Sequence, residues 1–275
     1  MSNGRLPDFI VIGAARSGTT TISRYLRAHP GVFMAQEKEV HFFDTDETFA
    51  LGVEWYKGRF AAARPDQIAG EATPAYMAVP RAVDRMASVV PNARLIAILR
   101  NPAERAYSMY WLARAWGAES RDPQEALGAA MRDPQSSERA SQYIGSYVDQ
   151  LEHVRRIYPS SALMTLLFED FTEAPDSTAR RVCEFIGADP SLVPDDVGRF
   201  RNEPRRVLSP RIHSLGERIR TRNVRIGERI LLLNSRKVDY PPLNGTLRSE
   251  LIEYFRPHND KLSQWLARDL SHWNR

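Results

Sequence analysis

The chain has 275 residues, enough for one large domain or two small ones, and its 43% hydrophobic and 26% charged residues are typical of a globular protein. No apolar run reaches the about 18 residues that a membrane-spanning helix needs, and the single cysteine, Cys183, excludes an internal disulfide framework and a cysteine-cluster metal site. A net charge of +4 is too small for a general binder of polyanions.

The basic residues are mostly arginine, 34 of 38. Arginine suits the bidentate capture of phosphate or sulfate, although a codon bias towards arginine explains the same excess. The neighbours of Cys183 are apolar at helical spacing, which indicates a packed and unreactive thiol.

Strand-like and helix-like segments alternate along the first two thirds of the chain. The predicted strands cover residues 7–12, 67–70, 94–100 and 162–168. The predicted helices cover residues 20–30 (ending at His29-Pro30), 80–90, 101–115, 142–157 and 174–187. This alternation predicts an α/β fold with a P-loop-like central parallel sheet and helices on both faces, in a single domain over residues 1–275.

The C-terminal part, residues 195–275, is predicted to be irregular and helical. It contains an arginine-dense helix near 209–232 and an amphipathic helix at about 246–270. The arginine-dense stretch raises the alternative of contact with RNA or a membrane. Interspersed Glu217 and Glu228 and the lack of stacking aromatics favour a solvated helix face instead, so we expect neither a nucleic acid nor a membrane as partner.

The first predicted strand leads into the small-residue loop Gly13-Ala-Ala-Arg16-Ser17-Gly18-Thr19-Thr20, and a helix follows. Small residues let successive backbone amides face one anion, and the helix adds free N–H groups and its positive dipole end. The loop resembles a Walker A loop, but Thr19 stands where a nucleotide kinase or NTPase needs lysine. Its cation is Arg16, which favours a site for one terminal phosphate. Hydroxyl donors are available at Ser17, Thr19, Thr20 and Thr21, and the alternative is a glycine-rich turn without a ligand.

A second group of candidates lies in LIAILRNPAERAYSMYW. Arg100 stands at the carboxyl end of the strand 94–100, the edge where open α/β sheets bind ligands. Asn101-Pro102 reads as the N-cap and first residue of the next helix, and Ser108 lies about two turns into that helix. Spacing alone does not bring Arg100 and Ser108 onto one anion; taken singly, each also reads as a surface cation and an ordinary helix serine.

A third group is the segment EKEVHFFD, from Glu37 to Asp44. Ionisable groups interleaved with two phenylalanines suggest a half-buried segment. Desolvation there is expected to raise the pKa of Glu39 towards a value useful for a general base. The sequence pattern by itself leaves a purely structural role for Glu39 open.

Taken together, these segments resemble the PAPS-dependent sulfotransferases, whose donor is 3′-phosphoadenosine-5′-phosphosulfate, over nearly the whole chain. IGAARSGTTTISRYLRAHP resembles the family's 5′-phosphosulfate loop, and LIAILRNPAERAYSMYW resembles its 3′-phosphate segment. EKEVHFFD with the later GVEWY is similar to the heparan sulfate sulfotransferase branch, as are GEATPAYM and YPPLNGTLRSELIEYFRPHNDKLSQWL.

The resemblance implies a role for each matching residue. Arg16 would contact the bridging oxygen of the leaving phosphate, and Glu39 would be the catalytic base with His41 as its partner or substitute. The 5′-phosphate would be cradled by Ser17, Gly18, Thr19 and Thr20, and the 3′-phosphate held by Arg100 and Ser108. To these we add the hydroxyl of Thr21 for the 5′-phosphate, and Arg205 and Arg206 of RNEPRRVLSP as contacts on the 3′-phosphate side.

Two departures from the heparan sulfate branch concern charge. Arg16 stands where that branch usually has lysine and is more like the tyrosylprotein and Golgi carbohydrate sulfotransferases. Ala72 stands where heparan enzymes commonly place a lysine near the reacting sulfate. One source of transition-state charge is therefore missing, which argues against a close copy of the heparan chemistry.

The predicted function is in-line transfer of a sulfuryl group from PAPS to a hydroxyl of a small-molecule or glycoside acceptor, leaving adenosine 3′,5′-bisphosphate. A sulfuryl group carries less charge than a phosphoryl group, so no metal is expected, and no ligand cluster such as HExxH is visible. The expected acceptor is a secondary metabolite, glycoside or lipid, and the expected enzyme is cytoplasmic and bacterial, with residues 195–275 completing the donor and acceptor sites. Two alternatives stay open: a P-loop nucleotide kinase or NTPase, and a catalytically silent adenosine-bisphosphate-binding protein. We make no prediction of the oligomeric state.

Overall fold

The computed structural model describes residues 4–192, 205–207, 209, 212, 215–216, 218–219, 224–237, 240–243 and 245–275. The chain divides into two compact units. The first unit comprises Met1–Arg100 and Tyr147–Asn202, and the second comprises Asn101–Ser146 and Glu203–Arg275.

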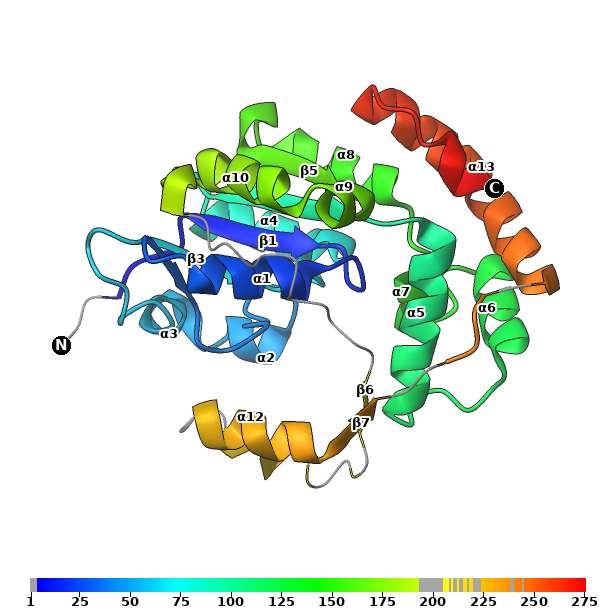
Figure 1. Ribbon diagram of the computed structural model, residues 1–275, viewed down its shortest axis with the longest axis horizontal. Helices are drawn as coiled ribbons and strands as arrows, with labels where there is room; N and C mark the ends of the chain where they lie inside the picture. The colour runs from blue at the N-terminus through cyan, green and yellow to red at the C-terminus, as the bar shows by residue number, and fades with distance from the viewer. Residues whose placement is uncertain are drawn as a thin grey trace. The chain divides into compact units, whose positions relative to one another are not determined.

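A parallel five-stranded sheet forms the centre of the first unit (Figure 1). Its strands are, in spatial order, β2 (Val32–Met34), β3 (Ile68–Ala72), β1 (Phe9–Gly13), β4 (Arg94–Leu99) and β5 (Leu163–Leu167). Phe9 of β1 aligns with Gly70 of β3 and with Arg94 of β4, and both pairings are parallel. The carboxyl ends of these strands therefore form one edge, the place where open α/β sheets bind ligands.

Helices cover both faces of this sheet. They are α1 (Thr19–Ala28), α2 (Asp46–Phe49), α3 (Gly52–Gly58), α4 (Pro80–Val89), α8 (Tyr147–Ile157), α9 (Phe168–Glu173) and α10 (Pro175–Ile186), with 3₁₀ turns at Tyr76–Ala78, Ser160–Ala162 and Pro190–Leu192. Successive residues of β1 point to opposite faces, and all five residues of the strand are buried. A strand buried on both sides explains why its sequence, FIVIG, is continuously apolar instead of alternating.

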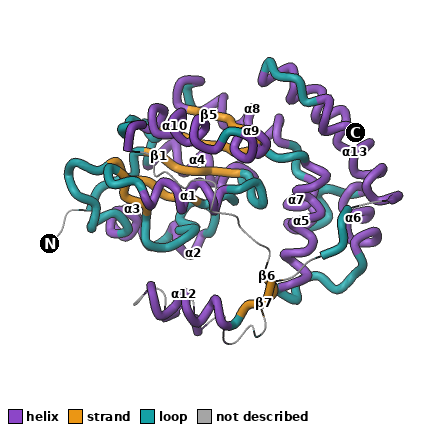
Figure 2. The backbone as a smooth tube through the Cα atoms, viewed as in Figure 1, coloured by secondary structure: helices purple, strands orange, loops and turns teal. Residues whose placement is uncertain are grey.

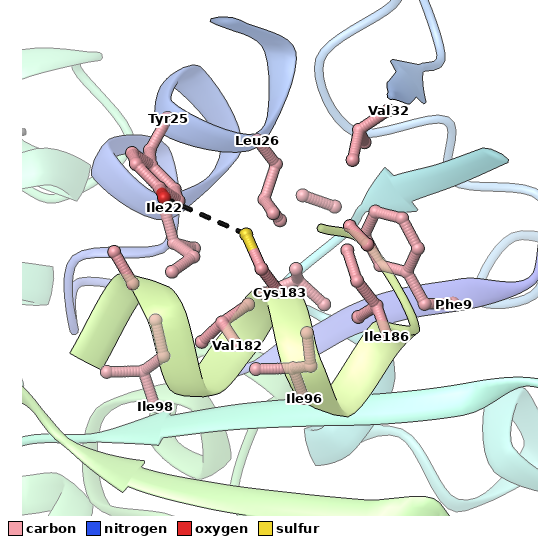
Figure 3. Packing of buried hydrophobic residues seen from close by; sticks show 14 of the residues in the cluster. Phe9, Ile22, Tyr25, Leu26, Val32, Ile96, Ile98, Val182, Cys183 and Ile186 are labelled. Carbon is pink, nitrogen blue, oxygen red and sulfur yellow. Dashed lines mark hydrogen bonds between the residues drawn. The ribbon is translucent and has the colours of Figure 1, made fainter. Parts of the chain in front are cut away.

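One core cluster lies between the sheet and the helices α1 and α10 (Figure 3). Helix α1 contributes Ile22, Tyr25 and Leu26, which repeat at the spacing of one helix face. The Cys183 thiol of α10 lies 3.7 Å from the Tyr25 hydroxyl and is buried. The predicted packing of Cys183 is thereby confirmed, and burial raises the pKa of its thiol.

The predicted α/β class is confirmed, with its central parallel sheet and helices on both faces. The four predicted strands correspond to β1, β3, β4 and β5. The predicted helix at 142–157 is wrong as a single element: it is the end of α7 (Glu138–Ile144) followed by α8, because the backbone becomes extended at Gly145 (ψ 135°). Strand β2 and the helices α2, α3, α6 and α9 were not predicted; three residues are too few to show a strand pattern.

The second unit is mainly helical (purple in Figure 2). Its described elements are α5 (Pro102–Ala115), α6 (Pro123–Arg132), α7, α12 (Val224–Leu233), α13 (Gly245–Leu266), a 3₁₀ turn at Ser271–Asn274, and the antiparallel pair β6 (Arg205–Val207) and β7 (Ser235–Lys237). The Asn101 side chain accepts a hydrogen bond of 3.0 Å from the Ala103 amide, which confirms the predicted start of α5.

The arginine-dense helix predicted at 209–232 is described only in part. Residues 210–211, 213–214, 217 and 220–223 of this range lie outside the described residues, and α12 covers the end of the predicted range. The predicted helix at 246–270 corresponds to α13. None of the described helices has the length and apolar character that crossing a bilayer requires.

Candidate active site

The predicted phosphate loop connects β1 to α1 at the carboxyl edge of the sheet. Gly18 precedes α1 with a left-handed backbone (φ 91°), a conformation that costs glycine little. No acidic side chain lies in the first turn of α1, so no carboxylate of that turn competes with an anion for its N-terminal amides and dipole. The Ser17 hydroxyl is fully buried and has no hydrogen-bond partner among the described residues. A buried orphan donor beside a helix N-terminus fits an anion, because such a group otherwise costs free energy.

One aromatic ring joins this loop to Arg100. A Cβ placed on Gly18 would lie 2.9 Å from Cδ2 of Phe168, so the loop backbone rests directly on that ring. The Arg100 guanidinium carbon lies 5.4 Å from the centre of the same ring, within the range of a cation–π contact. Phe168 begins α9 immediately after β5, the neighbour of β4. The two predicted anion-binding segments therefore lie at the same edge of one sheet.

The backbone of Arg100 is fixed by Tyr147. The Tyr147 hydroxyl donates to the Arg100 carbonyl at 3.1 Å, and the Arg100 amide lies 3.5 Å from the same hydroxyl oxygen. Arg100 directly follows β4, so its position is set by the strand on one side and by this hydroxyl on the other.

The third predicted group forms a compact cluster of charges. Oε2 of Glu39 lies 3.5 Å from Nε2 of His41, and Oε1 lies 3.3 Å from the Lys38 ammonium. Nδ1 of His41 lies 2.8 Å from Oδ2 of Asp44, so both ring nitrogens face a carboxylate. A histidine between two carboxylates is expected to carry a proton on each nitrogen.

The contacts within this cluster determine the charge states of His41 and Glu39. The hydrogen bond to Asp44, followed by the bond to Glu39, raises the pKa of His41 to about 10, so the ring is protonated at neutral pH. Burial alone raises the pKa of Glu39, but the His41 hydrogen bond and the Lys38 charge outweigh it and lower that pKa below its usual value. The expectation that desolvation lifts the pKa of Glu39 is therefore wrong, because two cations face its carboxylate.

The backbone around Glu39 is unusual. Glu39 (φ 66°) and His41 (φ 52°) both adopt left-handed conformations, which cost a non-glycine residue about 1–2 kcal/mol each. Hydrogen bonds between and beside them offset this cost, at about 0.5–1.5 kcal/mol each. The Val40 amide donates to Oγ1 of Thr73 at 2.9 Å, and the Phe42 amide donates to the Tyr76 hydroxyl at 3.0 Å.

These bonds also place Glu39 relative to the sheet. Thr73 follows the last residue of β3, and its amide donates to the carbonyl of Val11 in β1 at 3.1 Å. Val40 is thus attached to the carboxyl edge of the sheet, beside the strand that leads into the phosphate loop. Within the first unit the structure brings the loop residues 13–20, Arg100 and the Glu39–His41 pair to that edge.

Three other predicted residues belong to the second unit. Ser108 is buried in α5, where the Tyr240 hydroxyl lies 3.4 Å from its Oγ. Arg205 and Arg206 pair through their backbones with Lys237 and Arg236 of β7. Their contacts with a phosphate stay a prediction.

Sequence reasoning did not predict the contacts of several residues that shape this edge: Asp44, Phe168, and the buried Glu71, Thr73 and Tyr76. The only signal for the last three was a carboxylate inside an otherwise apolar strand, in GEATPAYM. In the described part of the chain no three His, Cys, Asp or Glu side chains form a group that could hold a metal ion.

The fold and the loop after β1 define a P-loop-like α/β protein that has Thr19 in place of the Walker lysine. A family model described as "Sulfotransferase domain" matches residues 6–204, and the chain belongs to this family. The prediction of a sulfotransferase is confirmed.

Similar proteins support this assignment. The crystal structure of a sulfotransferase from Alicyclobacillus acidocaldarius has a TM-score of 0.73 and 27% identity, and the match covers 98% of this chain and 100% of that one. Heparan sulfate glucosamine 3-O-sulfotransferase 5 of Mus musculus is 24% identical over 97% of this chain and 74% of its own length. The membrane-associated sulfotransferase kil1 of Dictyostelium discoideum is 37% identical over 43% of this chain, and this match spans only 25% of its own length. The resemblance to the heparan sulfate branch is thereby confirmed as a likeness of sequence.

Proposed function

We propose that this chain transfers a sulfuryl group from PAPS to a hydroxyl of a small-molecule or glycoside acceptor, as a single domain over residues 1–275. The observation that carries the proposal is the Phe168 ring, which contacts both the phosphate loop at Gly18 and the Arg100 guanidinium. A donor with two separate phosphate groups needs two anion sites at a fixed separation. Two such sites at one sheet edge, without the Walker lysine, suit PAPS better than a nucleoside triphosphate.

The loop would hold the 5′-phosphate side of the donor. The amides at the start of α1, the hydroxyls of Thr19, Thr20 and Thr21, and the orphan hydroxyl of Ser17 are the donors. Arg16 would stabilise the charge that grows on the bridging oxygen as the S–O bond breaks. Arg100 would hold the 3′-phosphate, and from the sequence alone we add Ser108, Arg205 and Arg206 to that contact.

Glu39 is the proposed base. Its carboxylate is ionised at neutral pH and accepts the proton of the acceptor hydroxyl as the acceptor oxygen bonds to sulfur. The sulfur–oxygen bond to the 5′-phosphate breaks in the same step, and adenosine 3′,5′-bisphosphate leaves. His41 is protonated at neutral pH and has no free lone pair, which favours Glu39 over His41 as the base. A sulfuryl group has too little charge to require a metal, so we propose a metal-independent reaction.

The acceptor class follows from similarity and charge. Several relatives are named as heparan sulfate sulfotransferases, but Ala72 stands where those enzymes commonly have a lysine. We therefore propose a smaller glycoside, or another small hydroxyl compound such as a secondary metabolite or lipid, in place of a heparan polymer.

The test is sulfuryl transfer from ³⁵S-labelled PAPS to a panel of glycosides, phenols and long-chain alcohols, followed by the same assay with Glu39→Gln. We expect turnover by Glu39→Gln to fall roughly 10²–10⁴-fold, the usual contribution of a general base, with unchanged affinity for adenosine 3′,5′-bisphosphate. The neighbouring Glu37→Gln is the matched control, because Glu37 pairs with Arg59 and faces no member of the cluster among the described contacts. Parental turnover in Glu39→Gln would refute the base, while donor binding without transfer to any acceptor would favour a silent binding protein. ATP turnover would favour the kinase alternative.

A further inference from the structure

Glu71 is a buried carboxylate that the proposed reaction does not use. It lies in β3, next to the carboxyl edge of the sheet, and its side chain has no exposed surface. We propose that Glu71, through the hydroxyls of Thr73 and Tyr76, is the positioning residue that holds the Glu39–His41 segment in its reactive conformation. This inference rests on the proposed role of Glu39 as the base.

The first step is the set of donors around Glu71. Oε1 accepts from the Tyr56 hydroxyl at 2.6 Å and from the Tyr76 hydroxyl at 3.2 Å. Oε2 accepts from Oγ1 of Thr73 at 2.6 Å. Three hydroxyl protons thus point at one carboxylate, and none of these three hydroxyls has a second proton to donate.

The second step is what remains on those oxygens. Since the hydroxyls of Thr73 and Tyr76 donate to Glu71, their oxygen lone pairs can accept hydrogen bonds from other groups. They accept from the amides of Val40 at 2.9 Å and Phe42 at 3.0 Å. Val40 directly follows Glu39, and Phe42 directly follows His41. Glu39 and His41 are the two residues of this segment with left-handed backbones. The Glu71 carboxylate therefore makes the hydroxyl oxygens of Thr73 and Tyr76 the acceptors in the hydrogen bonds that hold residues 39–42.

The third step is packing, which reinforces the same alignment. The Phe42 ring stacks on the Tyr56 ring with centroids 4.4 Å apart and an interplanar angle of 7°. The Phe43 ring meets the Tyr76 ring edge to face at 5.4 Å. The rings that follow His41 thus pack on the two tyrosines that donate to Glu71.

A purely structural role explains this arrangement less well. Burial raises the pKa of Glu71, which reflects the cost of an ionised group in an apolar core. Apolar residues of similar volume often fill such a site at no loss of stability. A carboxylate is needed only if the site requires an acceptor of several protons, as it does when Thr73 and Tyr76 must both accept from backbone amides.

The variants separate hydrogen-bond polarity from packing. Tyr76→Phe removes one relay and Thr73→Val the other, while Thr73→Ser keeps the second hydroxyl. Glu71→Gln keeps the shape of the side chain but replaces one acceptor oxygen by an NH₂ donor. If Glu71→Gln does not fold, Tyr76→Phe and Thr73→Val still test the proposal. Tyr158→Phe is the matched control, because Tyr158 is also buried and its hydroxyl donates to the Val90 carbonyl, away from the segment.

Two measurements are made on the purified full chain. The first is residue-resolved hydrogen–deuterium exchange, in which we expect faster exchange at the amides of Val40 and Phe42 in Tyr76→Phe, Thr73→Val and Glu71→Gln. The second is release of adenosine 3′,5′-bisphosphate from PAPS with water as acceptor. We expect it to slow roughly tenfold to a hundredfold in these variants, as for a misplaced catalytic group. Thr73→Ser and Tyr158→Phe should match the parent in both measurements.

Combining Tyr76→Phe with Glu39→Gln separates the two proposals. If Tyr76 acts through Glu39, the double variant is no slower than Glu39→Gln alone, whereas a general loss of structure would slow it further. A slow Glu39→Gln beside a parental Tyr76→Phe and Glu71→Gln would overturn the positioning role and leave the base intact. Parental hydrolysis by Glu39→Gln would overturn the base, and the positioning role with it.

Discussion

Gly18 offers the sharpest test of the phosphate loop, because one added methyl group meets two separate obstacles. The substitution Gly18→Ala puts a side chain on a left-handed residue (φ 91°) and drives its Cβ to 2.9 Å from the Phe168 ring. The backbone penalty is about 1–2 kcal/mol, and overpacking against a ring adds about 1–3 kcal/mol. We expect the free energy of unfolding to fall by about 2–5 kcal/mol and the affinity for adenosine 3′,5′-bisphosphate to fall with it.

Gly52 provides the matched control for Gly18. It lies in the same unit with φ 83°, and a Cβ there meets nothing within 4 Å. Gly52→Ala therefore reports the backbone penalty alone, and the difference between the two variants reports the contact with Phe168. Urea unfolding gives the two free energies, and titration calorimetry gives the affinities. If Gly18→Ala is as stable as Gly52→Ala and binds adenosine 3′,5′-bisphosphate like the parent, the loop does not rest on Phe168 and our account of the donor site is wrong.

Three further predictions concern single charged residues. Arg100→Ala should weaken binding of adenosine 3′,5′-bisphosphate roughly 10–100-fold, which is the contribution of a charged hydrogen bond. The control is Arg94→Ala, at the other end of β4, which should leave this affinity unchanged. Equal affinities for the two variants would exclude Arg100 from the site. The raised pKa of His41 contributes stability that is complete below pH 6.5 and is lost as the pH rises to about 10, so the parent should lose more stability than His41→Asn over that interval in urea unfolding. Hydrogen bonds from Arg121 lower the pKa of Glu119 to about 2, so the Glu119 carboxylate stabilises the second unit above pH 4.5 and this contribution is lost towards pH 2. The stability of Glu119→Gln should therefore depend less on pH during acid unfolding. An acid unfolding profile equal to that of the parent would contradict the pairing of Glu119 with Arg121.

The place of the phosphate loop and of Arg100 at one edge of the sheet was predictable because each directly follows an apolar strand. Once strands 7–12 and 94–100 are recognised and taken as parallel, the loop from Gly13 and the side chain of Arg100 must lie at the same edge. Strand β2 was missed for the opposite reason: its three residues are recognisable only through their pairing with β3, which is distant in sequence.

The state of Glu39 was not predictable in the same way. Sequence spacing gave its half-buried setting but not its left-handed backbone, which brings Lys38 and His41 to opposite oxygens of its carboxylate. That backbone depends on Thr73 and Tyr76, 33 and 34 residues away from the amides that they bind. Local pattern carries no information about such contacts, so the direction of the Glu39 pKa shift was predicted wrongly.

The position of Cys183 makes the rate of thiol modification a measure of how often the core of the first unit opens. The chain has one thiol, which belongs to α10 and is buried against α1 and the sheet, so a thiol reagent can modify the folded protein only when this packing opens. The modification rate then counts opening events, and a bound nucleotide that stabilises the closed unit slows it. At a hundred times the dissociation constant the slowing corresponds to about 2.7 kcal/mol, or roughly a hundredfold. Donor binding can therefore be measured on the unlabelled native chain before any acceptor is known.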